Sequence, residues 1–446
     1  MKKEIKKKFI KTLIGAVIFS LSNFPMTTII GLSVYITSFI HLKQSFVTMH
    51  YGTFFNPINQ ISTKIAGPIA GILEKKIGFH STLILGSFLI FISLIGYYIQ
   101  QNIYIFYILI CLMGFGNGVS IPYTKNLIMY EPKRKGLISS SIMIPNIFSM
   151  AIFKFLGEKI INKKGYTLNP KKNEIYYPEK ICKNIQIYFI LCIIIFPFLR
   201  IISMILMKKY NDDKEYREKK SENLIESNYI NKENENSVVY AIKSKRFLLI
   251  CCISFFSTFN QHFIVAIART FSALIGINGK ILQYLGIINS LSLVTISPLF
   301  GYLSDKIGTS IILKFLIFFN GAISFSFAIF INDKLMFVIL NFLMYIIFSG
   351  FLTTMNPHIM HVFGMNNSII LIGINGLFAT ISNIIASMTA FTTSKYYQTK
   401  LLNIPYRICF LIGGFFNIIS FILILNDNDT IFQYEEENKG KEMEKI

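Results

Sequence analysis

The octet GYLSDKIG at Gly301–Gly308 lies between two long apolar runs. A weaker copy, GILEKKIG, occupies Gly71–Gly78 in the first half of the chain. Each copy is a short basic turn with glycine at both ends, and the two turns occupy corresponding places in their halves. The repeat predicts two related bundles, one in each half of the sequence.

The composition predicts a membrane protein. Of the 446 residues, 53% are hydrophobic and 15% are charged, and the mean hydropathy is +0.53. About twelve stretches have the roughly 20 apolar residues needed to cross a bilayer. They begin near residues 12, 44, 81, 103, 137, 184, 246, 281, 311, 335, 367 and 406. Because unpaired backbone amides are costly in lipid, these spans are predicted to be helices, which makes the chain an all-α membrane protein.

One break divides the spans. Between Lys208 and Lys245 the apolar pattern stops, and a charged, Asn-rich stretch follows that cannot bury enough surface to fold alone. The sequence therefore predicts four segments. They are an N-terminal six-helix half (1–207), a cytoplasmic linker (208–245), a C-terminal six-helix half (246–426) and a cytoplasmic tail (427–446).

The net charge of +21 does not indicate nucleic-acid binding, because the lysines are spread over loops and tails. Their excess on one side predicts that both termini are cytoplasmic. We expect a multi-pass monomer in the lipid bilayer, and the plasma membrane and an organellar membrane both stay open. Five of the six cysteines fall inside apolar spans, which argues against a disulfide framework.

The octets and their surroundings are predicted to form a gate. Glycines let two helices approach closely, so Gly301 and Gly308 are expected to permit tight packing. Asp305 is expected to cap the next helix or to pair with a basic neighbour across the bundle, and Lys306 to meet lipid phosphates or helix C-termini. A plain interhelical turn is the alternative. The residues assigned to the gate are Gly67, Pro68, Gly71, Gly78, Gly301, Asp305, Lys306 and Gly308.

GYLSDKIG resembles the loop between the second and third helices of each half in the major facilitator superfamily, and twelve spans with a central linker match its architecture. The resemblance implies two six-helix halves of the major facilitator fold. Three further stretches are similar to the branch of monocarboxylate transporters and oxalate:formate antiporters: Gly67–His80, Gly114–Ser141 and His361–Phe378. The chain departs from this branch in its eighth helix, where Ser297 stands at the place of a substrate-pairing arginine.

Candidate substrate-binding residues are the polar and ionisable side chains inside spans, because an ionisable group there is costly and defaults to a functional hypothesis. Arg269 and His262 lie seven residues apart on the seventh helix, beside Asn260 and Gln261. A cation with amide donors can bind a carboxylate. Snorkelling of Arg269 and hydrogen bonding of His262 in the protein interior are the alternatives, and Lys64 is expected to snorkel. The remaining candidates are Lys125, Tyr123, Asn289 and Tyr345.

No Walker loop, nucleophile elbow or metal-binding spacing occurs, so we expect neither an enzyme nor a cofactor or metal. The sequence predicts a secondary carrier that moves small organic anions, monocarboxylate-like, by alternating access, coupled to protons or to exchange. A carrier of a neutral or cationic solute, such as an amino acid, sugar or drug, stays open as an alternative. A non-transporting receptor or scaffold is the third possibility.

Overall fold

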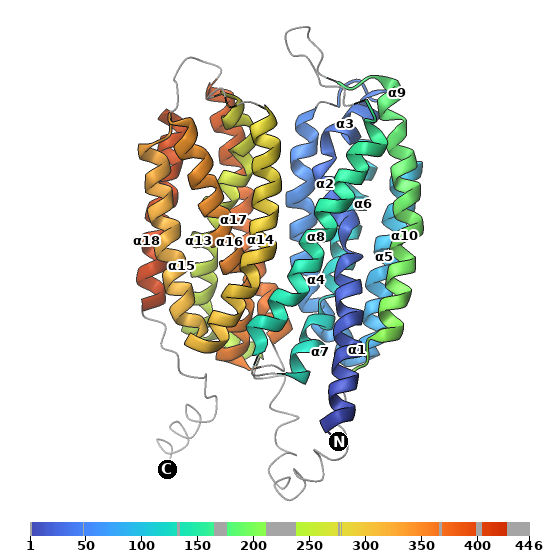
Figure 1. Ribbon diagram of the computed structural model, residues 1–446, viewed down its shortest axis with the longest axis vertical. Helices are drawn as coiled ribbons and strands as arrows, with labels where there is room; N and C mark the ends of the chain where they lie inside the picture. Colours follow the sequence, from blue (N-terminus) through green and yellow to red (C-terminus); the bar gives the residue numbers. More distant parts are fainter. Residues whose placement is uncertain are drawn as a thin grey trace, which may run out of the picture.

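In a computed structural model of the chain, the described residues are 2–47, 49–131, 134–164, 176–210, 238–274, 277, 279–364, 368–397 and 404–425. These residues form helices and connecting turns, with no strand among them, as predicted. Figure 1 shows two helical bundles side by side. We name the side at the bottom of Figure 1, where α1 begins and α18 ends, the terminal side.

The first bundle is built from the N-terminal part of the chain. Its helices are α1 (Lys2–Leu21), α2 (Phe24–Gly31), α3 (Ser33–His41), the 3₁₀-helix η1 (Met49–Phe54), α4 (Phe55–Ile77), α5 (Phe79–Ile99), α6 (Ile103–Val119), α7 (Pro122–Tyr130), α8 (Lys135–Ile161), α9 (Glu179–Cys182) and α10 (Asn184–Leu206). The second bundle contains α13 (Lys245–Leu274), α14 (Gly279–Ile307), α15 (Thr309–Ile329), α16 (Lys334–Phe363), α17 (Ser368–Tyr397) and α18 (Ile404–Leu425).

Ten described helical segments are long and apolar enough to cross a membrane. Helices α4 and α14, with 23 and 29 residues, exceed the roughly 20 residues that a crossing requires and complete the two sets of six. The predicted start of the second span near residue 44 is wrong. That span begins at Phe55, because residues 42–47 lie in turns outside any helix and η1 occupies Met49–Phe54.

The first span is broken rather than continuous. Helix α1 ends at Leu21, and α2 begins at Phe24 with Pro25 in its first turn. Proline lacks a backbone N–H and so fits the start of a helix but not its interior. Asn23 occupies the junction and is buried. The break places a polar side chain and a helix end inside the first bundle.

The two octets end their helices in the same way. Gly78 follows α4 with a φ of 87°, and Gly308 follows α14 with a φ of 110°. Glycine adopts this region at little cost. A Cβ on either residue would meet nothing within 4 Å, so the predicted close packing at Gly308 is wrong. Glycine is required there for backbone conformation, and the repeat at corresponding places is confirmed.

Two helix pairs join the halves by close backbone contact. A Cβ on Gly301 of α14 would lie 2.6 Å from the carbonyl oxygen of Gly136 on α8. A Cβ on Gly67 of α4 would lie 3.1 Å from Cα of Gly373 on α17. In both pairs the second span of one half meets the fifth span of the other. This equivalence is the pseudo-two-fold relation expected of two repeated halves.

Apolar packing closes the terminal side. One buried cluster, which we name the shared cluster, contains residues of both halves, such as Phe19, Leu127, Phe247 and Met355. Two other clusters each draw their members from a single half. The halves therefore share a core on the terminal side and have separate cores elsewhere.

Residues 211–237 of the predicted linker and the predicted tail, 427–446, lie outside the described residues. The linker prediction is wrong at its end. Residues 238–243 are helical, and Ala241 is buried in the shared cluster. An apolar residue packed against both halves explains why this stretch is ordered.

Replacement of Gly301 by alanine is expected to hinder closure of the terminal side, because the new methyl group would overlap the backbone of Gly136. Overpacking costs roughly 1–3 kcal/mol, which would favour the open state by about tenfold. The measurement is the alkylation rate of a cysteine at Ser140, a fully buried position beside Gly301, in a background without native cysteines. The matched control is Gly308→Ala, which strains the backbone but touches no neighbour. It should lower the melting temperature and leave the alkylation rate unchanged, whereas equal rates in all variants would contradict the account.

Candidate functional site

A carboxylate of one half caps a helix of the other. Asp305 lies in the last turn of α14 and accepts hydrogen bonds from the backbone N–H groups of Gly136 (2.8 Å) and Leu137 (2.9 Å). These amides belong to the first turn of α8, where no intrahelical acceptor is available and a negative charge is favoured. Lys135 of α8 is close enough to interact with the same carboxylate. We name this contact the latch.

The other predicted gate residues fall into two groups. On α4, the residues Gly67, Pro68 and Gly71 face α17, and a Cβ on Gly71 would lie 2.9 Å from Cγ1 of Ile370. On the exposed end of α14, the ammonium of Lys306 lies 5.9 Å from the ring centroid of Tyr302. The first group therefore lies between the halves, whereas Lys306 lies at the surface.

Lys64 and His262 meet near the middle of the spans. Lys64 extends from α4 toward α17, where a Cβ on Gly376 would lie 2.6 Å from its Cδ and 3.2 Å from its Nζ. It is close enough to His262 of α13 to interact with it electrostatically. The imidazole contacts the ring of Phe348 on α16, with centroids 6.0 Å apart. We name Lys64 and His262 the central pair, with one residue from each half.

The amides beside His262 have different surroundings. Asn260 donates to Asn320, which donates in turn to Asn417, so Asn260 belongs to a network that ties α13, α15 and α18 together. This network favours a structural role for Asn260. Gln261 is 1% exposed, and neither its Oε1 nor its Nε2 has a hydrogen-bond partner within the described part of the chain. Gln261 therefore has two polar atoms without a partner among the described residues, whereas Asn260 has only its Oδ1.

Asn289 and Tyr345 lie within the second half. Asn289 of α14 donates to Asn341 of α16 at 2.8 Å, and both side chains are buried. Tyr345 lies one helical turn after Asn341 and is half-buried. The structure describes the backbone of Arg269 on α13 but not its side chain, so its predicted role stays a prediction.

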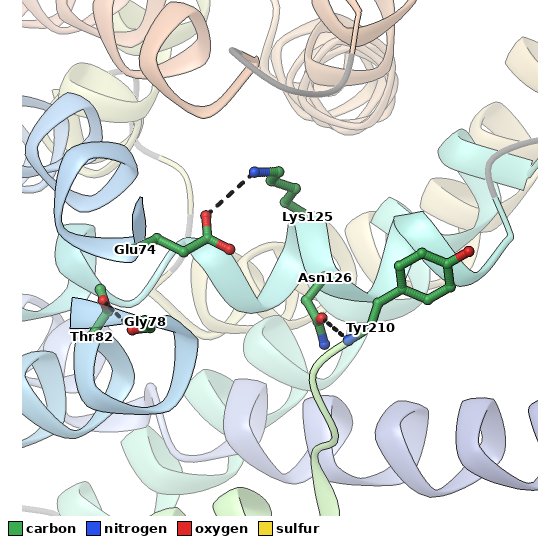
Figure 2. A network of polar contacts seen from close by, with 6 residues as sticks. All are labelled: Glu74, Gly78, Thr82, Lys125, Asn126 and Tyr210. Carbon is green, nitrogen blue, oxygen red and sulfur yellow. Dashed lines mark hydrogen bonds and ion pairs between the residues drawn. The ribbon is translucent and has the colours of Figure 1, made fainter. Parts of the chain in front are cut away.

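Lys125 lies apart from the central pair. Its ammonium is 3.4 Å from the carboxylate of Glu74, and the two side chains are 14% and 15% exposed (Figure 2). The next residue, Asn126, donates to the carbonyl of Lys208 and accepts from the N–H of Tyr210, which fixes the start of the linker on α7. An ion pair within the first half is favoured over direct substrate contact for Lys125.

The sequence analysis missed Arg200 of α10, which is 2% exposed. Its guanidinium lies 3.6 Å from the ring centroid of Phe19 and donates to Asn23 at the break between α1 and α2. Tyr123 lies near the same group, with its ring centroid 4.7 Å from that of Phe19. Arg200 is the one charged residue in the run from 187 to 206, and that isolation was the available signal.

Solved structures of two sugar:proton symporters are similar to this fold. A proton:xylose symporter, XylE, bound to 6-bromo-6-deoxy-D-glucose, matches with a TM-score of 0.68 at 12% identity, over 95% of this chain and 96% of that chain. The Escherichia coli fucose:proton symporter FucP matches with a TM-score of 0.67 at 13% identity, over 93% and 97% of the two chains. The protein therefore has the major facilitator fold.

No protein-family model matches the sequence, and no curated protein does so either. The resemblance to monocarboxylate transporters and oxalate:formate antiporters stays a prediction.

Substitution of Asp305 by alanine is expected to free the first turn of α8. Loss of a capping side chain costs about 0.5–2 kcal/mol. Hydrogen exchange of a peptide covering residues 134–142 should then speed up severalfold, because the amides of Gly136 and Leu137 lose their acceptor.

Asp333→Ala is the matched control. Asp333 caps α16 within its own half and accepts from the N–H groups of Leu335 and Met336. Its loss should speed exchange at the start of α16 and leave residues 134–142 unchanged. Unaltered exchange of this peptide in Asp305→Ala would show that the latch does not hold α8.

Proposed function

We propose that the protein is a secondary active carrier of small organic anions that works by alternating access. The central pair supports this substrate class, since Lys64 and His262 lie between the halves at mid-span. A lysine ammonium forms charge-assisted hydrogen bonds with a carboxylate, and a protonated or neutral imidazole can donate one more. Phe348 supplies an apolar wall beside the histidine for a short carbon chain.

The distribution of acidic residues supports the same substrate class. The described carboxylates lie at helix ends, as Glu74, Glu158, Asp305 and Asp333 do, or beside them, as Glu131 does. Within the part of the chain that the structure describes, the middle of the spans thus holds cations but no carboxylate. A carboxylate substrate would provide the missing negative charge, whereas a cationic substrate would be repelled.

Alternating access is supported by how the halves meet. The latch and the shared cluster hold the terminal side closed. Opening that side requires Asp305 to leave α8 and the shared cluster to separate, while the core of each half stays intact. Such a contact, broken and re-formed as rigid halves rock, is the expected device of a major facilitator carrier.

A sugar is the second candidate substrate. The similar solved structures are described as symporters of xylose and fucose with protons. Gln261, whose buried amide is unpartnered, could serve a sugar hydroxyl as readily as a carboxylate. The two substrate classes differ in their need for Lys64. An anion requires its positive charge, whereas a neutral sugar does not.

Counterflow in liposomes tests the substrate class. Purified protein would be assayed with labelled lactate, pyruvate, formate and oxalate beside xylose, fucose, glucose and several amino acids. We expect carboxylate exchange, and we expect Lys64→Gln and His262→Gln to weaken it by about ten- to a hundredfold, since a hydrogen bond to a charged group is worth roughly 1.5–3 kcal/mol. Arg269→Ala belongs in the same series.

Lys154→Gln is the matched control, because Lys154 is also a span lysine but its side chain lies against Gly31 of the first half. It should leave exchange near the wild-type rate. Exchange of sugars alone, unaffected by Lys64→Gln, would replace the anion with the second candidate. Flux of no solute at all would favour a receptor or scaffold.

A further inference from the structure

Arg200 is a buried cation whose hydrogen-bonding capacity is largely unused. Of its guanidinium nitrogens, Nη2 donates to Asn23, whereas Nε and Nη1 have no partner within the described part of the chain. The rings of Phe19 and Phe196 lie at 3.6 and 5.1 Å from its central carbon. Cation–π contact offsets part of the lost hydration but satisfies no N–H group.

Among the described residues, no carboxylate lies in position to neutralise this charge. Arg200 is six residues from the end of α10, inside the span, and the described acidic residues lie at or beside helix ends. An unpaired charge inside a span is costly and is rarely retained for packing alone, since an apolar residue of similar size packs as well or better. The two edges of a guanidinium that bind a carboxylate pair Nη2 with Nε and Nη2 with Nη1, so each edge of Arg200 keeps one unused nitrogen beside the Nη2 that donates to Asn23.

The surroundings of Arg200 add donors of the same kind. The hydroxyl of Tyr123 lies close to Ser20, Asn23 and Arg200. Helix α1 ends nearby, at Leu21. The negative end of its dipole stabilises the charge of Arg200 while no anion is bound. These groups together resemble a carboxylate site rather than a structural ion pair.

Phe19 connects this site to the movement of the halves. Its ring stacks on the guanidinium and is fully buried in the shared cluster, which contains residues of both halves. When the terminal side opens, the shared cluster is divided between the two halves, and the packing around Phe19 is weakened. The ring can then turn away and uncover Arg200 from the terminal side.

We propose that Arg200, Asn23 and Tyr123 form a second site for the substrate carboxylate, covered by Phe19 in the state described here and uncovered when the terminal side opens. The inference rests on the proposed anion carrier. Arg200 would be a second binding site between the central pair and the terminal side. An anion that leaves Lys64 and His262 would then bind a second cation before it reaches water.

Equilibrium binding of labelled pyruvate and oxalate to the full chain in nanodiscs tests this site, with the melting temperature measured in parallel. Arg200→Gln should weaken binding at least tenfold in an Asp305→Ala background, where the terminal side opens more readily. Without ligand its melting temperature should equal or exceed that of the parent, because an unpaired buried charge has been removed. Arg200→Lys keeps the charge but lacks the bidentate edge, and it should recover only part of the affinity.

Asn417→Ala is the matched control, since Asn417 is a buried asparagine in the hydrogen-bond network of the second half and lies outside the proposed sites. It should lower the melting temperature and leave binding unchanged. If Arg200→Gln behaves in this way, Arg200 is a packing residue and the second site is overturned. If Arg200→Gln does not fold, Asn23→Ser and Tyr123→Phe decide: weaker binding at an unchanged melting temperature supports the site, and unchanged binding overturns it.

Substrate binding by the parent protein and by the two single variants distinguishes the second site from the proposed anion carrier. Carboxylate binding that is lost in Lys64→Gln but kept in Arg200→Gln would remove the second site and leave the anion carrier intact. A parent that binds sugars and no carboxylate would overturn both.

Discussion

The carboxylate of Asp305 holds the two halves together through hydrogen bonds to the backbone of α8. It reaches two amides of α8 only because Gly301 and Gly136 let the backbones of α14 and α8 come into contact. The equivalent contact between α4 and α17, at Gly67 and Gly373, has close packing but no carboxylate, since Lys75 stands in the first octet where Asp305 stands in the second. The terminal side is therefore closed by one electrostatic contact and two steric ones.

The charges of the spans follow a simple division. Carboxylates lie at or beside helix ends, where they cap helices or form ion pairs, as Asp305 and Glu74 do. Cations also occur deep in the spans, at Lys64 and Arg200, where the described residues offer no negative partner. Buried cations without a negative partner are energetically costly while no substrate is bound. A bound anion would neutralise them and reduce that cost. The carboxylate of Asp305 at a helix end therefore serves the contact between the halves, whereas the cations within the spans serve the proposed anionic substrate.

The fold could be predicted because lipid permits few structures: apolar length fixed the spans, and the repeated octet fixed the two halves. The site was harder to predict, because contacts across the halves depend on which helix faces which. No sequence pattern relates Lys64 to His262, because the two residues lie in different halves of the chain. Lys64 was expected to snorkel. Arg200 was visible as an isolated charge and was overlooked, while Asn260 could not be assigned to a structural network without Asn320 and Asn417.

The most direct test of the central claim is a distance between the halves in a bilayer. Spin labels at Glu131 and Lys306, both exposed on the terminal side, one in each half, report how far that side is open. The account predicts a short and a long distance in exchange, with their proportions shifted when the transported solute is added. A single short distance that no carboxylate, sugar or amino acid changes would contradict alternating access.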